Sequence, residues 1–319
     1  APEARPERPR PRRSIPTQLL PWEPRGASAR ALPGQSAAVR AARRSLLLEL
    51  GLGAQPERSA SAERRGARRA VLIGVGSGAG AELQRRAMER LQSLLSAWGW
   101  ERSCVAVLSE GLGHRPTRAA IEGALGWLAE DARPGDALFL HFSGQGAQEE
   151  DPDGYAEEGM RRTILPADFE EAGAISDDRI NDLVVKALPE GVRLTVVMDC
   201  HGAGVGLPFS HTPSGWREET NPYHTPADVQ LFSCEGDGGQ SDLGAMATAF
   251  CDVLREHPRP CYSELWASLG MRCGTQPQLT SSQAFSFDRC FSLDDAVPNS
   301  NEQLGRSLRR RFPPRPRPV

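Results

Sequence analysis

Two apolar runs, each followed at once by a glycine-rich turn, constrain the fold of this 319-residue chain more than any other feature. The first run, 137–142, leads into the turn 143–146 (SGQG), and the second, 194–198, leads into the turn 199–204 (DCHGAG). Short apolar runs bounded by turns predict buried strands. Neighbouring parallel strands end at the same edge of a sheet, where open α/β folds place their ligand sites. We therefore expect the two turns to lie side by side at that edge.

Strand-like and helix-like segments alternate along the rest of the chain, as in a parallel sheet with helical crossovers. Strands are predicted at 70–75, 104–108, 137–142, 194–198, 228–233 and 285–293. Helices are predicted at 81–98, 116–132, 180–187, 244–255 and 262–271. The expected fold is α/β, with a mostly parallel six-stranded sheet flanked by helices on both faces.

Composition separates a body from two basic arms. Residues 1–69 are expected to form an Arg/Pro-rich disordered arm with one short helix at 36–53, and 295–319 an Arg/Pro-rich tail. The net charge is +9 over 1–69 (15 Arg, 6 Glu) and +6 over 305–319, which leaves −18 for 70–304. An acidic body argues against nucleic-acid binding through the core.

Cysteine usage and hydropathy indicate the compartment. The seven cysteines form no CxxC motif and no Cys/His cluster at zinc spacing, and no secretory signal is present, so reduced thiols in the cytoplasm are expected. No stretch reaches the ~18 apolar residues that a bilayer span needs. The chain starts at Ala1 rather than Met, so we expect an incomplete N-terminus, and its Arg-, Ala- and Ser-rich composition leaves an organelle transit peptide open.

A set of segments, taken in order, resembles the type I metacaspases, which are cysteine peptidases of the caspase fold. The matching segments are 69–74 (RAVLIG), 116–121 (PTRAAI), 134–136 (PGD), 141–144 (HFSG), 164–169 (ILPADF), 173–178 (GAISDD), 188–195 (LPEGVRLT), 227–229 (ADV), 232–233 (FS), 244–246 (GAM) and 276–282 (QPQLTSS). Their order and spacing carry the resemblance. It implies a caspase-like domain at 70–294, large-subunit-like over 70–210 and small-subunit-like over 225–294, and it implies a monomer.

The catalytic motifs of that family are altered here. The general-base histidine of its Ser-Gly-His-Gly motif corresponds to Gln145, whose amide does not titrate. Its Asp-Ser-Cys-His-Ser-Gly motif aligns with 199–204 in two ways. Without a gap, His201 takes the nucleophile position, whereas with a one-residue deletion Cys200 takes it. The ungapped alignment is favoured, and both stay open.

The substrate pocket that the resemblance implies has also changed. Metacaspases select Arg or Lys at the cleaved bond through carboxylates, and Ser143 and Asp199 keep two of the pocket positions. The family's Asn-Asp pair, at the start of the first helix, falls on Arg86 and Ala87. One carboxylate is therefore lost, which removes a charge-assisted hydrogen bond to a basic substrate.

Calcium is the usual activator of the family, and hard cations bind several clustered oxygen ligands. Asp177 and Asp178 match two of the family's ligands. The remaining ligands would fall in 161–166 (RRTILP) and 206–208 (GLP), where basic or apolar residues replace the acids. We expect a remnant calcium site that does not function, and no cofactor.

Base, nucleophile, specificity carboxylate and metal ligands thus all depart from the family pattern. The favoured hypothesis is a catalytically inactive pseudopeptidase in the cytoplasm that acts by binding or regulating a protein or peptide. The alternative is a weakly active cysteine endopeptidase that uses Cys200 and cleaves after basic residues. A third hypothesis is a gene fragment without function.

Overall fold

The computed structural model describes residues 48–49, 66–76, 78–112, 114–151, 160–200, 204–219, 223–234 and 244–296. All of them belong to the unit formed by 41–319. The basic arm and the tail lie almost wholly outside these residues, and of the predicted helix at 36–53 only Leu48 and Glu49 are described, both helical. Within the described part of the chain, no helix is both long and apolar enough to cross a bilayer.

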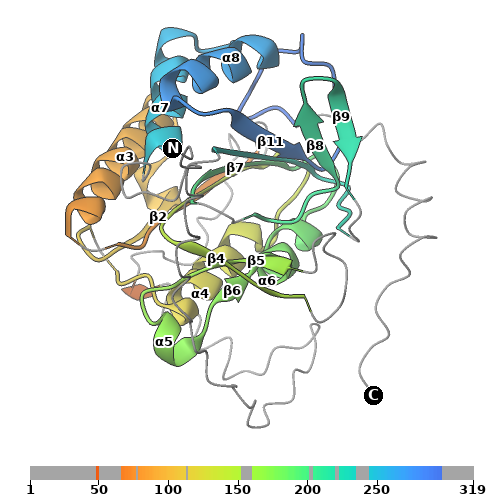
Figure 1. The fold of residues 1–319 in the computed structure, drawn as a ribbon. Coiled ribbons are helices and arrows are strands. Elements are labelled where there is room, and N and C mark those ends of the chain that lie inside the picture. Colours follow the sequence, from red (N-terminus) through yellow and green to blue (C-terminus); the bar gives the residue numbers. More distant parts are fainter. Residues whose placement is uncertain are drawn as a thin grey trace, which may run out of the picture. The chain divides into compact units, whose positions relative to one another are not determined.

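The central sheet of the described residues has eight strands in the order β2-β1-β3-β7-β10-β11-β8-β9 (Figure 1). The parallel strands are β1 (Arg68–Gly74), β2 (Val105–Ser109), β3 (Ala137–Ser143), β7 (Arg193–Asp199) and β10 (Asp228–Cys234). The antiparallel strands that extend the sheet are β11 (Pro277–Ser281), β8 (Phe209–Thr212) and β9 (Gly215–Glu218). The α/β class is confirmed, whereas the predicted six-stranded sheet is wrong because these short antiparallel strands enlarge it.

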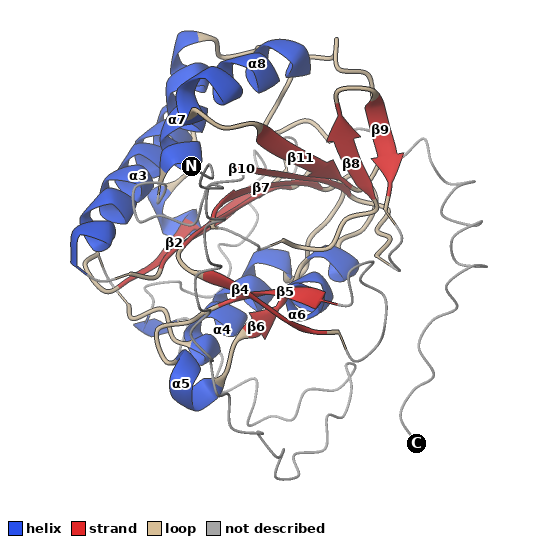
Figure 2. Cartoon of the chain, in the orientation of Figure 1, coloured by secondary structure: helices blue, strands red, loops and turns tan. Residues whose placement is uncertain are grey.

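Helices cover both faces of the sheet, as predicted (Figure 2). On one face lie α3 (Gly78–Ala97), α7 (Ala245–Glu256) and α8 (Tyr262–Cys273). On the other lie α4 (Arg118–Ala129) and α6 (Asp177–Leu183), followed by the 3₁₀ turn η2 (Val185–Ala187). Two smaller elements are the 3₁₀ turn η1 (Arg102–Cys104) and the one-turn helix α5 (Phe169–Ala172).

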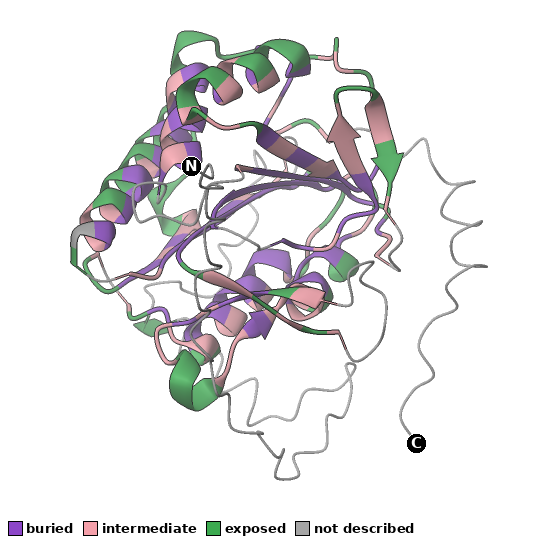
Figure 3. Cartoon of the chain, viewed as in Figure 1, coloured by how far each residue is buried: buried purple, intermediate pink, exposed green. Residues whose placement is uncertain are grey.

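Every residue of β3 and β7 is buried (Figure 3). Strands of a parallel sheet that is covered on both faces read as continuous apolar runs, which is why these two segments could be recognised from sequence. Their side chains alternate between two apolar cores. One core joins the sheet to α3, α7 and α8, and the other joins it to α4 and α6.

A second, antiparallel sheet in the described residues has the order β4-β5-β6. It consists of β4 (Gly146–Glu150), β5 (Met160–Ile164) and β6 (Ile175–Ser176). Because β4 begins three residues after the last residue of β3, the turn at the end of β3 leads directly into this small sheet. The backbone at Gln145 is therefore fixed on one side by β3 of the central sheet and on the other by β4 of the small sheet.

The predicted strand at 285–293 is wrong. The segment turns at its centre, where the Arg289 N–H donates to the Ser286 carbonyl at 3.2 Å, so no continuous ladder forms. Its alternating apolar residues instead anchor a loop in the core next to α7 and α8. The residues concerned are Phe285, Phe287, Phe291 and Leu293. Alternation of this kind predicts a strand. A loop that buries every second side chain has the same pattern, so the sequence does not distinguish the two.

Candidate functional site

The ends of β3 and β7 lie side by side, which confirms the predicted adjacency of the two turns. Ser143 is paired with Asp199 in the parallel register, and the Gly144 N–H donates to the Asp199 carbonyl at 3.3 Å. Gln145 and Cys200 therefore leave the sheet at the same edge. Gln145 is exposed, and its carbonyl accepts a hydrogen bond from the Leu165 N–H at 3.0 Å.

Asp199 and Cys200, although consecutive, face opposite sides of the sheet, as neighbouring residues at a strand end do. The Asp199 carboxylate lies on the side of α7. Cys200 is only 9% exposed and belongs to the core beneath α4 and α6, together with Val205 and Leu207. The sheet therefore separates Cys200 from any side chain that contacts the Asp199 carboxylate.

The Asp199 carboxylate binds the first turn of α7. Its Oδ1 accepts a hydrogen bond from the Met246 N–H at 2.6 Å, and its Oδ2 accepts one from the Ala247 N–H at 3.1 Å. These N–H groups have no partner within their own helix, and the helix dipole favours an anion there. Burial nevertheless raises the pKa of Asp199 to about 8, and the neighbouring Cys234 adds to the rise while the two N–H donors oppose it.

His141 lies on the same side of the sheet as Asp199 and is fully buried. Its Nδ1 is 3.1 Å from the Val197 carbonyl oxygen and 3.9 Å from Asp199 Oδ2. Burial lowers the pKa of His141 to about 4, so its imidazole is neutral at neutral pH. Its Nε2 and the Ser143 hydroxyl have no hydrogen-bond partner among the described residues. His141 is therefore a packed histidine of the strand and is out of reach of a bound peptide.

Ala87, the third predicted pocket residue, is also fully buried. A Cβ placed on Gly244, the residue before α7, would lie 2.9 Å from the Ala87 Cβ. Ala87 and Asp199 therefore both pack against the beginning of α7. Arg86, its neighbour in sequence, instead points outward with 66% of its side chain exposed and pairs with Glu82 at 2.8 Å.

Asp177 and Asp178 lie in the first turn of α6. Burial raises the pKa of Asp177 to about 6, with a further rise from Asp178, whereas Arg162 and Arg161 lower it. Within the described ranges, no group of three or more His, Cys, Asp or Glu side chains could hold a metal ion. Calcium takes about 6–8 oxygen ligands. Two carboxylates beside two guanidinium groups do not fit that ion.

His201 lies outside the described residues. The choice between Cys200 and His201 at the nucleophile position therefore stays a prediction. The remaining predicted residues are divided by the fold. Ala87 and Asp199 pack at the start of α7 and Ser143 pairs with Asp199 in the sheet, while Cys200 lies on the other face.

Gln84 of α3 is a residue of this edge that no sequence motif singles out. Its side-chain Nε2 donates to the Val75 carbonyl at 2.9 Å and to the Ser143 carbonyl at 3.1 Å, so it ties the end of β1 to the end of β3. The available signal was its helical spacing from Met88 and Leu91, which places an amide on the buried face of the helix.

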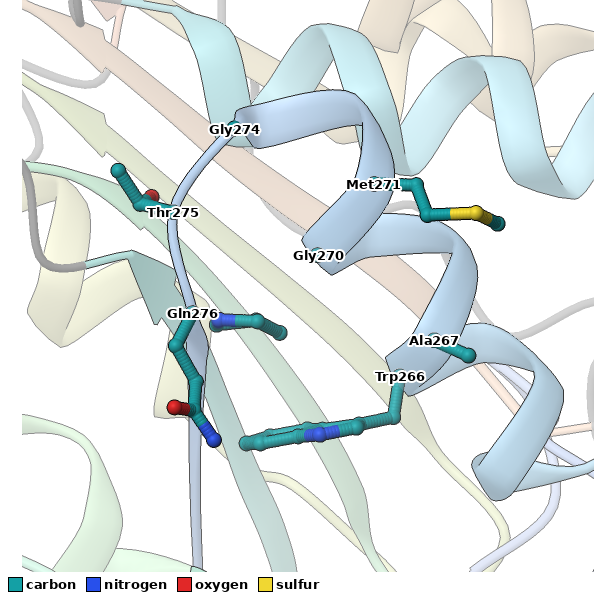
Figure 4. A pocket seen from close by; sticks show the side chains of 8 residues that line it. Trp266, Ala267, Gly270, Met271, Gly274, Thr275 and Gln276 are labelled. Atoms are coloured by element: carbon teal, nitrogen blue, oxygen red, sulfur yellow. The ribbon is translucent and has the colours of Figure 1, made fainter.

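A surface hollow of about 390 Å³ lies at the end of α8 and the beginning of β11 (Figure 4). Trp266 and Met271 line it from α8, and the Gln276 side chain lies beside the Trp266 ring. None of the predicted site residues that the structure describes lines this hollow. The candidate site is therefore defined by the strand ends and not by this cavity.

Comparison with known proteins points to one family. Residues 68–209 match the family model of the metacaspase, peptidase C14 domain. Metacaspase-1 of Plasmodium falciparum is 33% identical over 216 residues, which are 61% of this chain and 35% of that protein. Metacaspase-1 of Saccharomyces cerevisiae is 43% identical over 133 residues, which are 40% of this chain and 31% of that protein. The chain thus spans about a third of the length of these two relatives.

The fold has a counterpart among solved structures. A crystal structure of a Geobacter sulfurreducens protein superposes with a TM-score of 0.52 at 17% identity, covering 72% of this chain and 99% of that one. At this identity the likeness concerns the fold alone. The family match covers both turns, with Gln145 in the first and Cys200 in the second. The chain therefore carries, at residues 68–209, a domain of the metacaspase family of C14 peptidases.

Proposed function

We propose that this chain is a catalytically inactive member of the metacaspase family that acts by binding or regulating a protein or peptide. The observation that carries the proposal is Gln145 at the end of β3, directly beside the end of β7. A cysteine peptidase needs a titrating base there to generate and orient the thiolate. An amide does not accept a proton near neutral pH, and general-base catalysis typically contributes ~10²–10⁴-fold.

No described histidine near this edge replaces the missing base. His141 is buried on the α7 side of the sheet and is held neutral by its surroundings, and Cys200 is packed on the α4 side. Proton transfer requires a heavy-atom distance of about 2.6–3.2 Å or one bridging water. The intervening sheet excludes such a contact between these two side chains.

The position of Cys200 also weighs against the alternative, a weakly active endopeptidase. Reactive cysteines are at least partly exposed and have positively charged surroundings that stabilise the thiolate. Cys200 instead belongs to an apolar core with Val205 and Leu207. With only 9% of its surface exposed, it lacks the accessibility that such a cysteine needs.

Recognition of a basic substrate residue is weakened for a separate reason. The Asp199 carboxylate is engaged by two backbone N–H groups of α7, so a substrate guanidinium would compete with them. Ala87 supplies no second carboxylate. We therefore propose that binding specificity for Arg or Lys at this position is lost together with the chemistry.

We also propose that the protein works without calcium, because Arg161 and Arg162 lie near Asp177 in place of further acidic ligands. As for partners, the charge of −18 over 70–304 supports binding of a protein or peptide rather than of nucleic acid. A cytoplasmic monomer is part of the same proposal.

The test is covalent labelling with an electrophilic peptide that carries Arg at the position to be cleaved. Wild type, Cys200→Ala and the control Cys104→Ala are each incubated with the probe, with and without millimolar calcium. We expect no labelling above background at any position near the two turns, as measured by intact-protein mass spectrometry. Labelling of wild type and of Cys104→Ala that disappears in Cys200→Ala would overturn the proposal in favour of the endopeptidase.

A further inference from the structure

We propose that Cys261 and Cys290 form a redox-dependent disulfide that fastens the closing segment, residues 285–293, to the beginning of α8. Neither cysteine belongs to the site at the ends of β3 and β7. The proposal rests on the backbone pairing of the two residues, on their accessibility and on the packing that holds the closing segment in place.

The backbone places the two cysteines opposite each other. They form an isolated antiparallel bridge. The hydrogen bonds that define it flank the pair: the Tyr262 N–H donates to the Arg289 carbonyl at 3.0 Å, and the Phe291 N–H donates to the Pro260 carbonyl at 2.8 Å. Cys261 and Cys290 are therefore a non-hydrogen-bonded pair, the kind whose side chains come closest together.

This geometry suits a disulfide without movement of the backbone. In a non-hydrogen-bonded antiparallel pair the Cα atoms are about 4.5 Å apart. Disulfides join residues whose Cα atoms are about 4.4–6.8 Å apart. The Cys261 sulfur now lies 2.9 Å from the Ser263 hydroxyl, so closure requires rotation of this side chain toward its partner.

The pair is also accessible to an oxidant. Of the seven cysteines, all of which lie in the described ranges, Cys290 alone is exposed, and Cys261 is half-buried. Cys200 and Cys251 are buried. A dissolved disulfide therefore meets Cys290 first, and Cys261 is the thiol placed to react next.

The closing segment is fixed on both sides of Cys290. On one side, the Phe285 carbonyl accepts a hydrogen bond from the Trp216 indole N–H at 2.7 Å. On the other, the Phe291 ring packs against Phe250 and Tyr262, with centroids 5.7 and 5.6 Å apart. These contacts hold Cys290 in register with Cys261, so the disulfide needs little additional ordering of the chain.

The oxidant that we name is glutathione disulfide, and the chemistry is thiol–disulfide exchange. The Cys290 thiolate attacks one glutathione sulfur, which forms a mixed disulfide and releases one reduced glutathione. The Cys261 thiolate then attacks the Cys290 sulfur, forming the Cys261–Cys290 bond and releasing the second glutathione. Two protein thiols are oxidised and one glutathione disulfide is reduced to two thiols, with two protons transferred to the leaving groups.

Oxidation is expected to stabilise the protein. The disulfide closes a loop of about 30 residues, which restricts the unfolded chain. For a domain of this size we expect the Tm to rise by about 5 °C or more. The gain should be reversed by dithiothreitol.

The experiment measures the Tm of the full chain after equilibration with glutathione disulfide or with dithiothreitol, and maps disulfides by mass spectrometry without reduction. Trypsin places Cys261, Cys273 and Cys290 on separate peptides, because arginines at 272 and 289 precede Cys273 and Cys290. The expected product links peptide 256–272 to peptide 290–306. Cys290→Ser should remove both the linked peptide and the rise in Tm, and the control Cys104→Ser should keep both.

Three results would contradict the proposal. One is glutathione on both cysteines with no linked peptide. A second is a rise in Tm that persists in Cys290→Ser. The third is a link between Cys234 and Cys273 in place of the expected one, because these two thiols also lie within hydrogen-bonding distance of each other.

Discussion

Asp199 shows how burial and hydrogen bonding compete at a single side chain. The two N–H groups of α7 stabilise the carboxylate, whereas its removal from water destabilises it. The second effect is larger, since the pKa of Asp199 is raised to about 8 mainly by burial. His141, 3.9 Å away, is subject to the same desolvation, and the pKa of its imidazole is lowered to about 4.

The stability of the protein should therefore fall as the pH rises from about 6.5 to 8. In this range the folded state holds a proton on Asp199 that the unfolded state has lost, and the resulting slope is at most about 1.4 kcal/mol per pH unit. His141 acts in the opposite direction, but only between its folded pKa of about 4 and its ordinary value of about 6.5. Above about pH 6.5, Asp199 therefore determines how these two groups make the free energy of unfolding depend on pH.

The corresponding experiment measures the free energy of unfolding of wild type and Asp199→Asn by urea denaturation between pH 6.5 and 8. We expect the wild-type value to decrease by up to about 2 kcal/mol over this range and the variant to show a flat profile. Asp252→Asn changes a surface carboxylate of the helix that Asp199 binds and should keep the wild-type slope. A slope in Asp199→Asn equal to that of wild type would show that another group is responsible.

Among the elements, the beginning of α7 is the one on which the candidate site depends most. Gly244 precedes the helix with φ +84°, and the space beside its Cα is occupied by Ala87 of α3. The close approach of these two elements brings the N–H groups of Met246 and Ala247 to Asp199. A side chain at Gly244 would disturb both the turn and the packing.

Gly244→Ala should therefore destabilise the protein more than an alanine at another left-handed glycine. Gly274, after α8, has φ +68° and open space within 4 Å of the point that a Cβ would occupy, so Gly274→Ala carries only the left-handed strain of ~1–2 kcal/mol. Gly244→Ala adds overpacking against Ala87, which typically costs about 1–3 kcal/mol. Chemical denaturation of both variants checks the difference, and equal losses would mean that α7 moves away from Ala87 at little cost.

Several elements could be predicted because local sequence determines them. The parallel strands β1, β3 and β7 each contain a buried apolar run, β10 alternates polar with apolar residues, and α3 shows the spacing of an amphipathic helix. The hairpin of β8 and β9 is short and half polar, and β11 begins with a proline, so none of the three carries an apolar run. Their positions depend on the pairing of β11 with β10 and of β8 with β11, which are long-range contacts that local patterns do not encode.

In the candidate site, too, some contacts could be predicted from the sequence and others could not. The adjacency of Ser143 and Asp199 follows from parallel strands that end at one edge, and it could be predicted. The bonds from Met246 and Ala247 to Asp199 could not, because they join residues 47 and 48 positions apart through the packing of a helix on the sheet. The burial of Cys200 likewise depends on the opposite helical layer.

Across the whole molecule, a buried polar network links β7, β10 and α8. The Arg193 guanidinium donates to Asp228 at 2.8 Å, to Gln230 at 2.7 Å and to the Tyr262 hydroxyl at 3.1 Å. Arg193 and Asp228 are both almost completely buried. The network therefore connects the large-subunit-like part of the chain to the small-subunit-like part that the sequence predicts.

Arg193→Met should destabilise the protein strongly, by about 3–5 kcal/mol, because it leaves the Asp228 carboxylate buried without its guanidinium. Arg115→Met breaks an exposed ion pair with Glu110 and should cost no more than about 1 kcal/mol. Thermal and urea denaturation of both variants measures the contrast. A small loss in Arg193→Met would indicate that the network contributes little to joining the two parts.

The attachment of Asp199 to α7 has a consequence for how such sequences evolve. An aspartate that holds a helix in place is kept by selection for folding, whether or not a substrate is ever bound. The residues around it that served chemistry alone have no such protection and are free to drift. In a lineage that has abandoned proteolysis, this aspartate would be among the last motif residues to disappear, and its presence in a relative says little about whether that relative still cuts peptides.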